Sequence, residues 1–155
     1  MEQSVTLKEK MKMETKFNFN SAICTSKEQS ERLLALGLKK ETADMYYAKH
    51  WQTAVVKKHD ADVLEKENFP AWSLHRLFSL IPKEFEIDVI PMYGENYKMP
   101  IELHILPDLS IVYTDLAKED YKGFYYINIY DSLIACIEWQ VEQGYFNKEY
   151  LNENI

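Results

Sequence analysis

Few residues of this chain have both the type and the spacing that chemistry at a single site requires. The densest group of possible metal ligands is the string His59-Asp60-Ala61-Asp62, with His50 and Glu65 nearby. Imidazole and carboxylate groups can together bind a hard or borderline cation. Adjacent side chains seldom reach one ion without ligands from elsewhere, and the sequence offers no second cluster. We therefore expect a solvated charged loop here and no metal site.

Nucleophilic catalysis needs a nucleophile, a base and a group that orients the base. Cys24 could pair with one of the four histidines, and Ser73 with His75. Ser73 precedes a helical pattern, however, and a serine that caps a helix is poorly placed to act as a nucleophile. We therefore favour a protein without enzymatic activity. A deep pocket that holds His59 or His104 beside a carboxylate would instead indicate an enzyme of unfamiliar type.

The glycines exclude the common phosphate-binding loops. All four stand alone in the sequence, at Gly37, Gly94, Gly123 and Gly144. No Gly-rich stretch can therefore hold phosphate groups with its backbone amides, and we expect no cofactor.

One string is similar to the first ribonucleoprotein motif of RNA-recognition domains. It runs Lys122-Gly123-Phe124-Tyr125-Tyr126-Ile127-Asn128-Ile129. In that motif a basic residue meets phosphate and strand aromatics stack on bases, which would give these roles to Lys122, Phe124 and Tyr126. Tyr125 stands where the pattern has Gly or Ala. This string therefore supports one possible function, a module that stacks RNA, a nucleotide or another small ligand on sheet tyrosines. It is the alternative to the protein-binding function that the charge and the aromatic residues favour below.

The distribution of charge argues against nucleic acid as a partner. The net charge of −7 arises entirely in residues 101–155, which hold 3 basic and 10 acidic groups. Such a surface repels phosphate backbones and can attract a basic protein. A helix, Gly, helix pattern over residues 28–47 resembles a helix-turn-helix, but Leu33 stands where that motif needs a small residue.

Length and composition are typical of one globular domain. The chain has 155 residues, of which 46% are hydrophobic. It has two well-separated cysteines and neither a leader-like nor a membrane-spanning apolar run, which predicts a cytoplasmic protein without membrane contact. Apolar residues in the range 1–20 do not recur at a spacing that would form a buried face, so these residues are expected to be a flexible tail. Residues 21–155 are expected to form the single domain.

Hydrophobic periodicity predicts helices first. Thr25 and Glu28 suggest a capping box for a helix that Gly37 ends. A second helix is expected over residues 41–48, and a third that Ser73 caps. A last helix is expected from Asp131 or Ser132 to Gly144.

From Phe85 onward the period changes to two, which is typical of strands. Alternating runs start at Phe85, Ile101, Leu109 and Phe124, and Pro107-Asp108 predicts a tight turn between the second and third. Alternation with polar residues favours an antiparallel sheet with one wet side. The predicted fold is α+β, a two-layer structure in which helices pack on one face of a four-stranded antiparallel meander.

Aromatic and acidic residues of the last third are the predicted partner-binding surface. Trp139 points away from the apolar stripe of its helix, so it is either buried under another element or exposed to a partner. The candidate partner-binding residues are Trp139, Tyr125, Tyr145, Glu138 and Glu142.

Three segments are similar to a family of sequences. They are residues 25–38 (TSKEQSERLLALGL), 70–77 (PAWSLHRL) and 144–151 (GYFNKEYL). Together they resemble an uncharacterised family of small proteins from gut anaerobic bacteria and their phages or mobile elements. The resemblance implies no activity and no functional residues. It implies only that the protein, like many accessory proteins, acts by binding another macromolecule.

Overall fold

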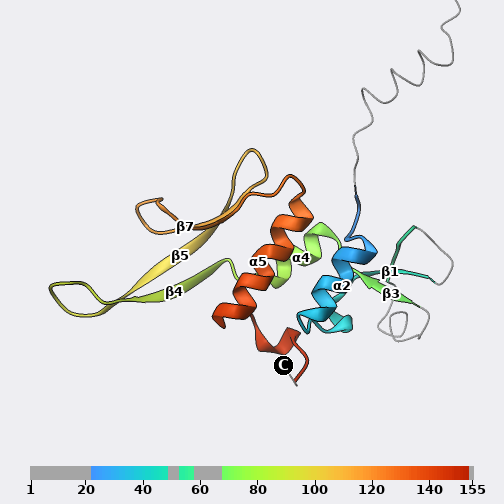
Figure 1. Ribbon diagram of the computed structural model, residues 1–155, viewed down its shortest axis with the longest axis horizontal. Coiled ribbons are helices and arrows are strands. Elements are labelled where there is room, and N and C mark those ends of the chain that lie inside the picture. The colour runs from blue at the N-terminus through green and yellow to red at the C-terminus, as the bar shows by residue number, and fades with distance from the viewer. Residues whose placement is uncertain (1–21, 49–52, 58–67, 154–155) are drawn as a thin grey trace, which may run out of the picture.

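The computed structural model describes residues 22–48, 53–57 and 68–153. Figure 1 shows a four-stranded sheet on one side of the helices and a smaller sheet on the other. Helix α5 contacts two strands of the larger sheet, and helix α2 contacts a strand of the smaller one. The predicted α+β architecture with an antiparallel meander is confirmed. The predicted tail and the histidine-aspartate string at 59–62 lie outside the described residues.

The larger sheet has the order β4-β5-β6-β7, with every neighbouring pair antiparallel. Its strands are β4 (Glu84–Val89), β5 (Tyr97–Ile105), β6 (Ile111–Thr114) and β7 (Asp120–Phe124). The prediction of a fourth strand from Phe124 to Tyr130 is wrong, because β7 ends where that run was expected to begin. The side chain of Asn128 accepts a hydrogen bond from the Tyr130 backbone N–H at 2.8 Å and thereby starts a helix.

The turn between β5 and β6 agrees with the prediction from Pro107-Asp108. The Leu109 N–H donates to the Leu106 carbonyl at 2.8 Å, and the Leu106 N–H donates to the Ser110 carbonyl at 2.9 Å. Leu109 has a φ of 67°, in the left-handed region. This is a three-residue hairpin loop closed by a bulge, and its left-handed position normally holds glycine.

Three α-helices are described: α2 (Lys27–Ala35), α4 (Leu74–Leu80) and α5 (Ile129–Gln143). The predicted capping box is shifted by one residue. Ser26 accepts from the Gln29 N–H at 3.1 Å, and the Gln29 side chain accepts from the Ser26 N–H at 2.9 Å. Thr25 is buried instead and accepts from the backbone of Trp72 at 3.0 Å.

Other helix boundaries agree better with the sequence pattern. Ser73 caps α4, as predicted, by accepting from the Arg76 N–H at 3.2 Å. Gly37 follows the end of α2 with a φ of 97°, and Gly144 ends α5 with a φ of 77°, both in the left-handed region. Helix α5 begins two to three residues earlier than predicted, at Ile129.

The predicted helix at 41–48 is wrong. A single 3-10 turn, η1 (Lys40–Thr42), precedes strand β1 (Met45–Tyr47), which pairs with β2 (Val55–Val56) and β3 (Phe69–Ala71). Long-range contacts decide this conformation: the Trp72 indole N–H donates to Thr42 Oγ1 at 2.9 Å, and the Asp44 carboxylate accepts from the Ser73 N–H at 2.9 Å. Tertiary pairing here overrides local helix propensity.

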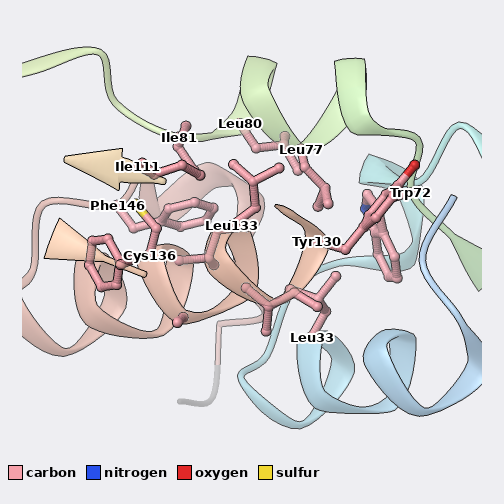
Figure 2. Packing of buried hydrophobic residues seen from close by; sticks show 14 of the residues in the cluster. Leu33, Trp72, Leu77, Leu80, Ile81, Ile111, Tyr130, Leu133, Cys136 and Phe146 are labelled. Atoms are coloured by element: carbon pink, nitrogen blue, oxygen red, sulfur yellow. The ribbon is translucent and has the colours of Figure 1, made fainter. Parts of the chain in front are cut away.

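The main core lies where the helices meet the larger sheet. Figure 2 shows Leu77 of α4, Leu133 of α5 and Leu33 of α2 converging on one interior. All three are fully buried, and each such burial contributes on the order of 1.5–3 kcal/mol. This packing fixes α5 against the inner face of the sheet, and it therefore fixes the position of α5 beside the edge strand β7.

Candidate functional site

Most of the predicted site residues gather along one open groove between strand β7 and helix α5. The groove has a volume of about 460 Å³. It is lined by Lys122, Gly123, Phe124, Tyr125, Tyr126, Ala135, Glu138, Trp139 and Glu142. We call it the β7–α5 groove. It includes every residue predicted above for partner or nucleic-acid binding except Tyr145.

The segment between β7 and α5 is held in place by hydrogen bonds at the helix start. The Tyr126 N–H donates to Ser132 Oγ at 3.2 Å, and Ser132 is fully buried. Phe124 is buried in the core just before this segment. These two attachments leave the Tyr126 ring 55% exposed at the mouth of the groove.

Tyr125 folds back along the strand from which it emerges. An added Cβ on Gly123 would collide with the outer end of the Tyr125 ring. The Tyr125 hydroxyl donates to Asp120 Oδ2 at 3.1 Å, and this hydrogen bond raises the pKa of the phenol. Gly123 thus makes room for a ring that remains 59% exposed.

Trp139 is mainly a structural ring. Its indole packs at 5.9–6.1 Å against five other aromatic rings, and only part of it faces the groove. Those rings belong to Phe85, Tyr113, Tyr121, Phe124 and Tyr145. Trp139, Tyr125 and Tyr145 therefore do not form one exposed patch.

Tyr145 belongs to the same aromatic cluster. Its ring stacks on Phe85 at 4.3 Å with an interplanar angle of 21°. Burial raises the pKa of its phenol. Tyr145 supports Trp139 from behind and does not line the groove.

The two predicted acidic residues differ in their charge environment. Glu138 forms an ion pair with Arg32 of helix α2 at 2.8 Å. Glu142 is exposed, and no ion pair is found for it among the residues described. Lys122 lies 5.7 Å from the centroid of the Phe124 ring. Among the described residues, Glu142 is therefore the carboxylate of the groove that has no ion pair, and Lys122 is a cation that lines the same groove.

An apolar patch adjoins the groove at the end of the sheet. Ile111 pairs with Phe124, so the β5–β6 turn lies beside the residues that follow β7. The patch consists of Leu106, Leu109, Tyr126 and Ile127, all exposed. The Tyr125 ring is not part of it, because that ring lies back over Gly123 toward Asp120. We call it the sheet-end patch. The sequence signal for it was a Tyr-Tyr-Ile run directly after a strand, which was interpreted as more strand.

Phe124 does not suit the RNA-binding interpretation. Its ring is 5% exposed and points into the core, so it cannot stack on a base. Lys122 and Tyr126 remain accessible, but a ribonucleoprotein-like motif needs its strand aromatics on the open face of the sheet.

The thiols and the serine considered for catalysis have structural surroundings. Burial raises the pKa of the Cys24 thiol and raises that of Cys136 to about 12, so both stay protonated and weakly nucleophilic. Ser73 donates to the Asp44 carboxylate and caps α4. His104 lies 3.8 Å from Glu102, and both side chains are more than a third exposed on the wet face of the sheet.

Two further observations concern the described part of the chain. No group of three or more His, Cys, Asp or Glu side chains within it is arranged to hold a metal ion. None of its helices is long and apolar enough to cross a bilayer.

Comparison with protein-family models, with curated proteins and with solved structures finds no significant match to this chain. The family resemblance of its three segments therefore stays a prediction.

Proposed function

We propose that this chain is a non-enzymatic accessory protein that binds another protein through the β7–α5 groove and the sheet-end patch. The observation that carries the proposal is the groove itself. Within the described residues it unites an exposed tyrosine pair, a carboxylate without an ion pair and a strand edge without a further strand. Exposed apolar patches beside polar rims are typical of protein-interaction sites. Cytoplasmic location and a partner with basic character are part of this proposal.

The sheet-end patch supports the same function. Ile127 is fully exposed, and Leu109 is 52% exposed although its left-handed backbone favours glycine or asparagine. A large apolar side chain at a strained and exposed position gives nothing to the core. Its presence is accounted for if a partner covers it.

Site-directed photo-crosslinking in the native host tests the proposal. A benzoylphenylalanine in place of Tyr126 lies at the groove, and one in place of the exposed His75 lies on helix α4 as the matched control. We expect covalent adducts with protein from position 126 and none from position 75. Equal labelling from both positions, no adduct, or an adduct that nuclease removes would contradict the proposal.

A further inference from the structure

We infer that the β7–α5 groove binds its partner by strand addition: an extended segment of another protein pairs with the open edge of β7 and places a basic side chain against Glu142. The inference rests on the proposed function and specifies the partner segment and the way it binds. It depends on which backbone groups of β7 are free, on what flanks them, and on the charge that faces them.

The hydrogen-bond pattern of the sheet identifies the free backbone groups. The Leu106 N–H donates to the Ser110 carbonyl, and the Leu103 N–H donates to the Lys83 carbonyl. In an antiparallel ladder the direction of these groups alternates from residue to residue. Ile111 and Tyr113 therefore direct their backbone groups toward β7.

Their partners on β7 complete the assignment. Ile111 pairs with Phe124, and Tyr113 pairs with Lys122. Phe124 and Lys122 thus turn their backbone groups toward β6, while Gly123 turns its groups outward. The same alternation assigns the outward direction to Tyr125, the first residue after the end of β7 at Phe124. Strand β7 is the last strand of its sheet in the described part of the chain, so these outward groups have no strand partner there.

The two edges of the sheet are not equivalent as templates. Strand β4 carries Glu84, Glu86 and Asp88 at alternate exposed positions, and such charges protect an edge against pairing. Strand β7 has a register shift opposite Tyr113 and Thr114 and the cation of Lys122, which limit pairing at its start. What remains open is a short stretch around Gly123 and Tyr125, beside a groove.

The groove supplies the side-chain contacts that an added strand needs. Alternate side chains of a strand point to opposite faces, so one set would enter the groove, where Ala135 and Trp139 form an apolar floor. Glu142 borders the same groove and has no ion pair in the described part of the chain, whereas Arg32 already neutralises Glu138. A Lys or Arg that enters the groove would therefore pair with Glu142, and a neighbouring apolar residue would cover Trp139.

A pair of backbone-methylated peptides tests the inference directly. The probe is a blocked seven-residue peptide that alternates valine with arginine, together with two versions N-methylated at every second residue in opposite frames. Methylation removes the N–H donors that strand addition uses in one frame only. We expect the two versions to differ at least tenfold in Kd, with the amide hydrogens of Gly123 and Tyr125 protected from exchange by the tighter binder.

Variants of the chain test the two contacts separately. Tyr125→Pro removes the outward N–H, while Tyr125→Ala removes the ring and keeps the N–H, so we expect weaker peptide binding for Tyr125→Pro than for Tyr125→Ala. Glu142→Gln should raise the Kd of the arginine peptide about two- to fivefold at low salt, as for one exposed charge pair, and Glu149→Gln should leave it unchanged. Arg32→Met should strengthen binding, because it frees the charge of Glu138. Thermal unfolding of each variant checks that it folds.

The outcomes separate this inference from the proposed function. Tighter binding by a glutamate version of the peptide would overturn the basic contact with Glu142, and equal binding by both methylated frames or no binding by any version would overturn strand addition. So would pairing of two copies of the chain through β7, seen by sedimentation, or preferential binding of oligouridine. In those cases, protein crosslinks from position 126 without crosslinks from position 75 would still support the proposed function. The absence of crosslinks from position 126 would contradict the proposed function, independently of the peptide results.

Discussion

The ring of Tyr125 occupies the space in which a side chain on Gly123 would lie. The two residues are neighbours on one face of the strand edge, and the hydrogen bond from Tyr125 to Asp120 holds the ring there at 3.1 Å. Glycine in a strand interior weakens the strand unless something covers it. Here the covering ring comes from the residue that directly follows the strand, and it also forms one wall of the β7–α5 groove.

Gly123→Ala should therefore release the Tyr125 ring without unfolding the protein. Only the outer end of a flexible side chain has to move, and alanine is the better strand residue by about 0.5–1 kcal/mol. The hydrogen bond to Asp120 breaks, so the pKa of Tyr125 should fall toward its ordinary value of 10.0. The measurement is an NMR titration of ring-labelled tyrosine.

Asp120→Asn is the control for this prediction. It removes the carboxylate that raises the pKa of Tyr125 and leaves Gly123 in place. Both variants should lower the pKa of Tyr125 and leave that of Tyr145 as it is. An unchanged Tyr125 titration in Gly123→Ala would mean that the ring does not rest on the strand in solution.

Periodicity predicted the sheet because every second side chain of a strand faces the core and is therefore apolar. The runs that begin at Phe85 and Ile101 pair with each other as expected, at the register Phe85 to Ile101. The prediction failed at residues 124–130, a run of aromatic and β-branched residues that is typical of a strand. A strand that ends at an exposed patch and one that continues into the core have the same pattern of residue types.

The small sheet could not be predicted for a different reason. Residues 45–47 form β1 only because residues 55–56 and 69–71 pair with both of its edges. Sequence alone does not specify such non-local pairing for strands this short. The groove was predictable in its residues, since eight of its nine lining residues lie in two short segments, 122–126 and 138–142. Its shape was not, because the position of α5 on the sheet depends on core contacts between residues far apart in the sequence, such as Leu33, Ile111 and Leu133.

Leu109→Asn should stabilise the protein. Leu109 has a φ of 67°, and a left-handed conformation costs an ordinary residue about 1–2 kcal/mol, less for asparagine. The side chain is 52% exposed, so its loss forfeits little burial. We expect a gain of about 0.5–1 kcal/mol in urea unfolding. Leu106→Asn, in the same patch at a residue without positive φ, is the control and should give no gain.

Protein crosslinking from position 126 should weaken in Leu109→Asn if the sheet-end patch binds the partner.

Gln140→Met should also stabilise the protein, from the inside of helix α5. The Gln140 side chain is fully buried. Its amide lies near the Tyr113 hydroxyl, but neither its nitrogen nor its oxygen makes a hydrogen bond of normal geometry among the described residues. An unsatisfied buried amide costs about 1–3 kcal/mol, and methionine has a similar length without that cost. We expect a higher midpoint of thermal unfolding. Gln143→Met, an exposed position on the same helix, should change the midpoint little. A lower midpoint for Gln140→Met would show that the amide is hydrogen-bonded, for instance to Tyr113.

The buried thiol of Cys136 predicts a loss of stability in alkaline solution. Burial raises its pKa from 9.0 to about 12, so the folded state keeps a proton that the unfolded state releases. Below pH 9 both states hold the proton and the contribution is constant. Between about pH 9 and pH 12 the unfolded state binds fewer protons at this residue. This thiol alone should then lower the free energy of unfolding by about 1.4 kcal/mol per pH unit, and buried tyrosines with raised pKa, such as Tyr113, add to the slope above pH 10. Urea unfolding at pH 8, 9, 10 and 10.5 measures this slope.

Cys136→Ala should lower stability at every pH by leaving a cavity, yet show a shallower slope above pH 9. Burial raises the pKa of Cys24 as well, so Cys24→Ala serves as the comparison. An unchanged slope in Cys136→Ala would mean that the thiol is not buried in the folded protein.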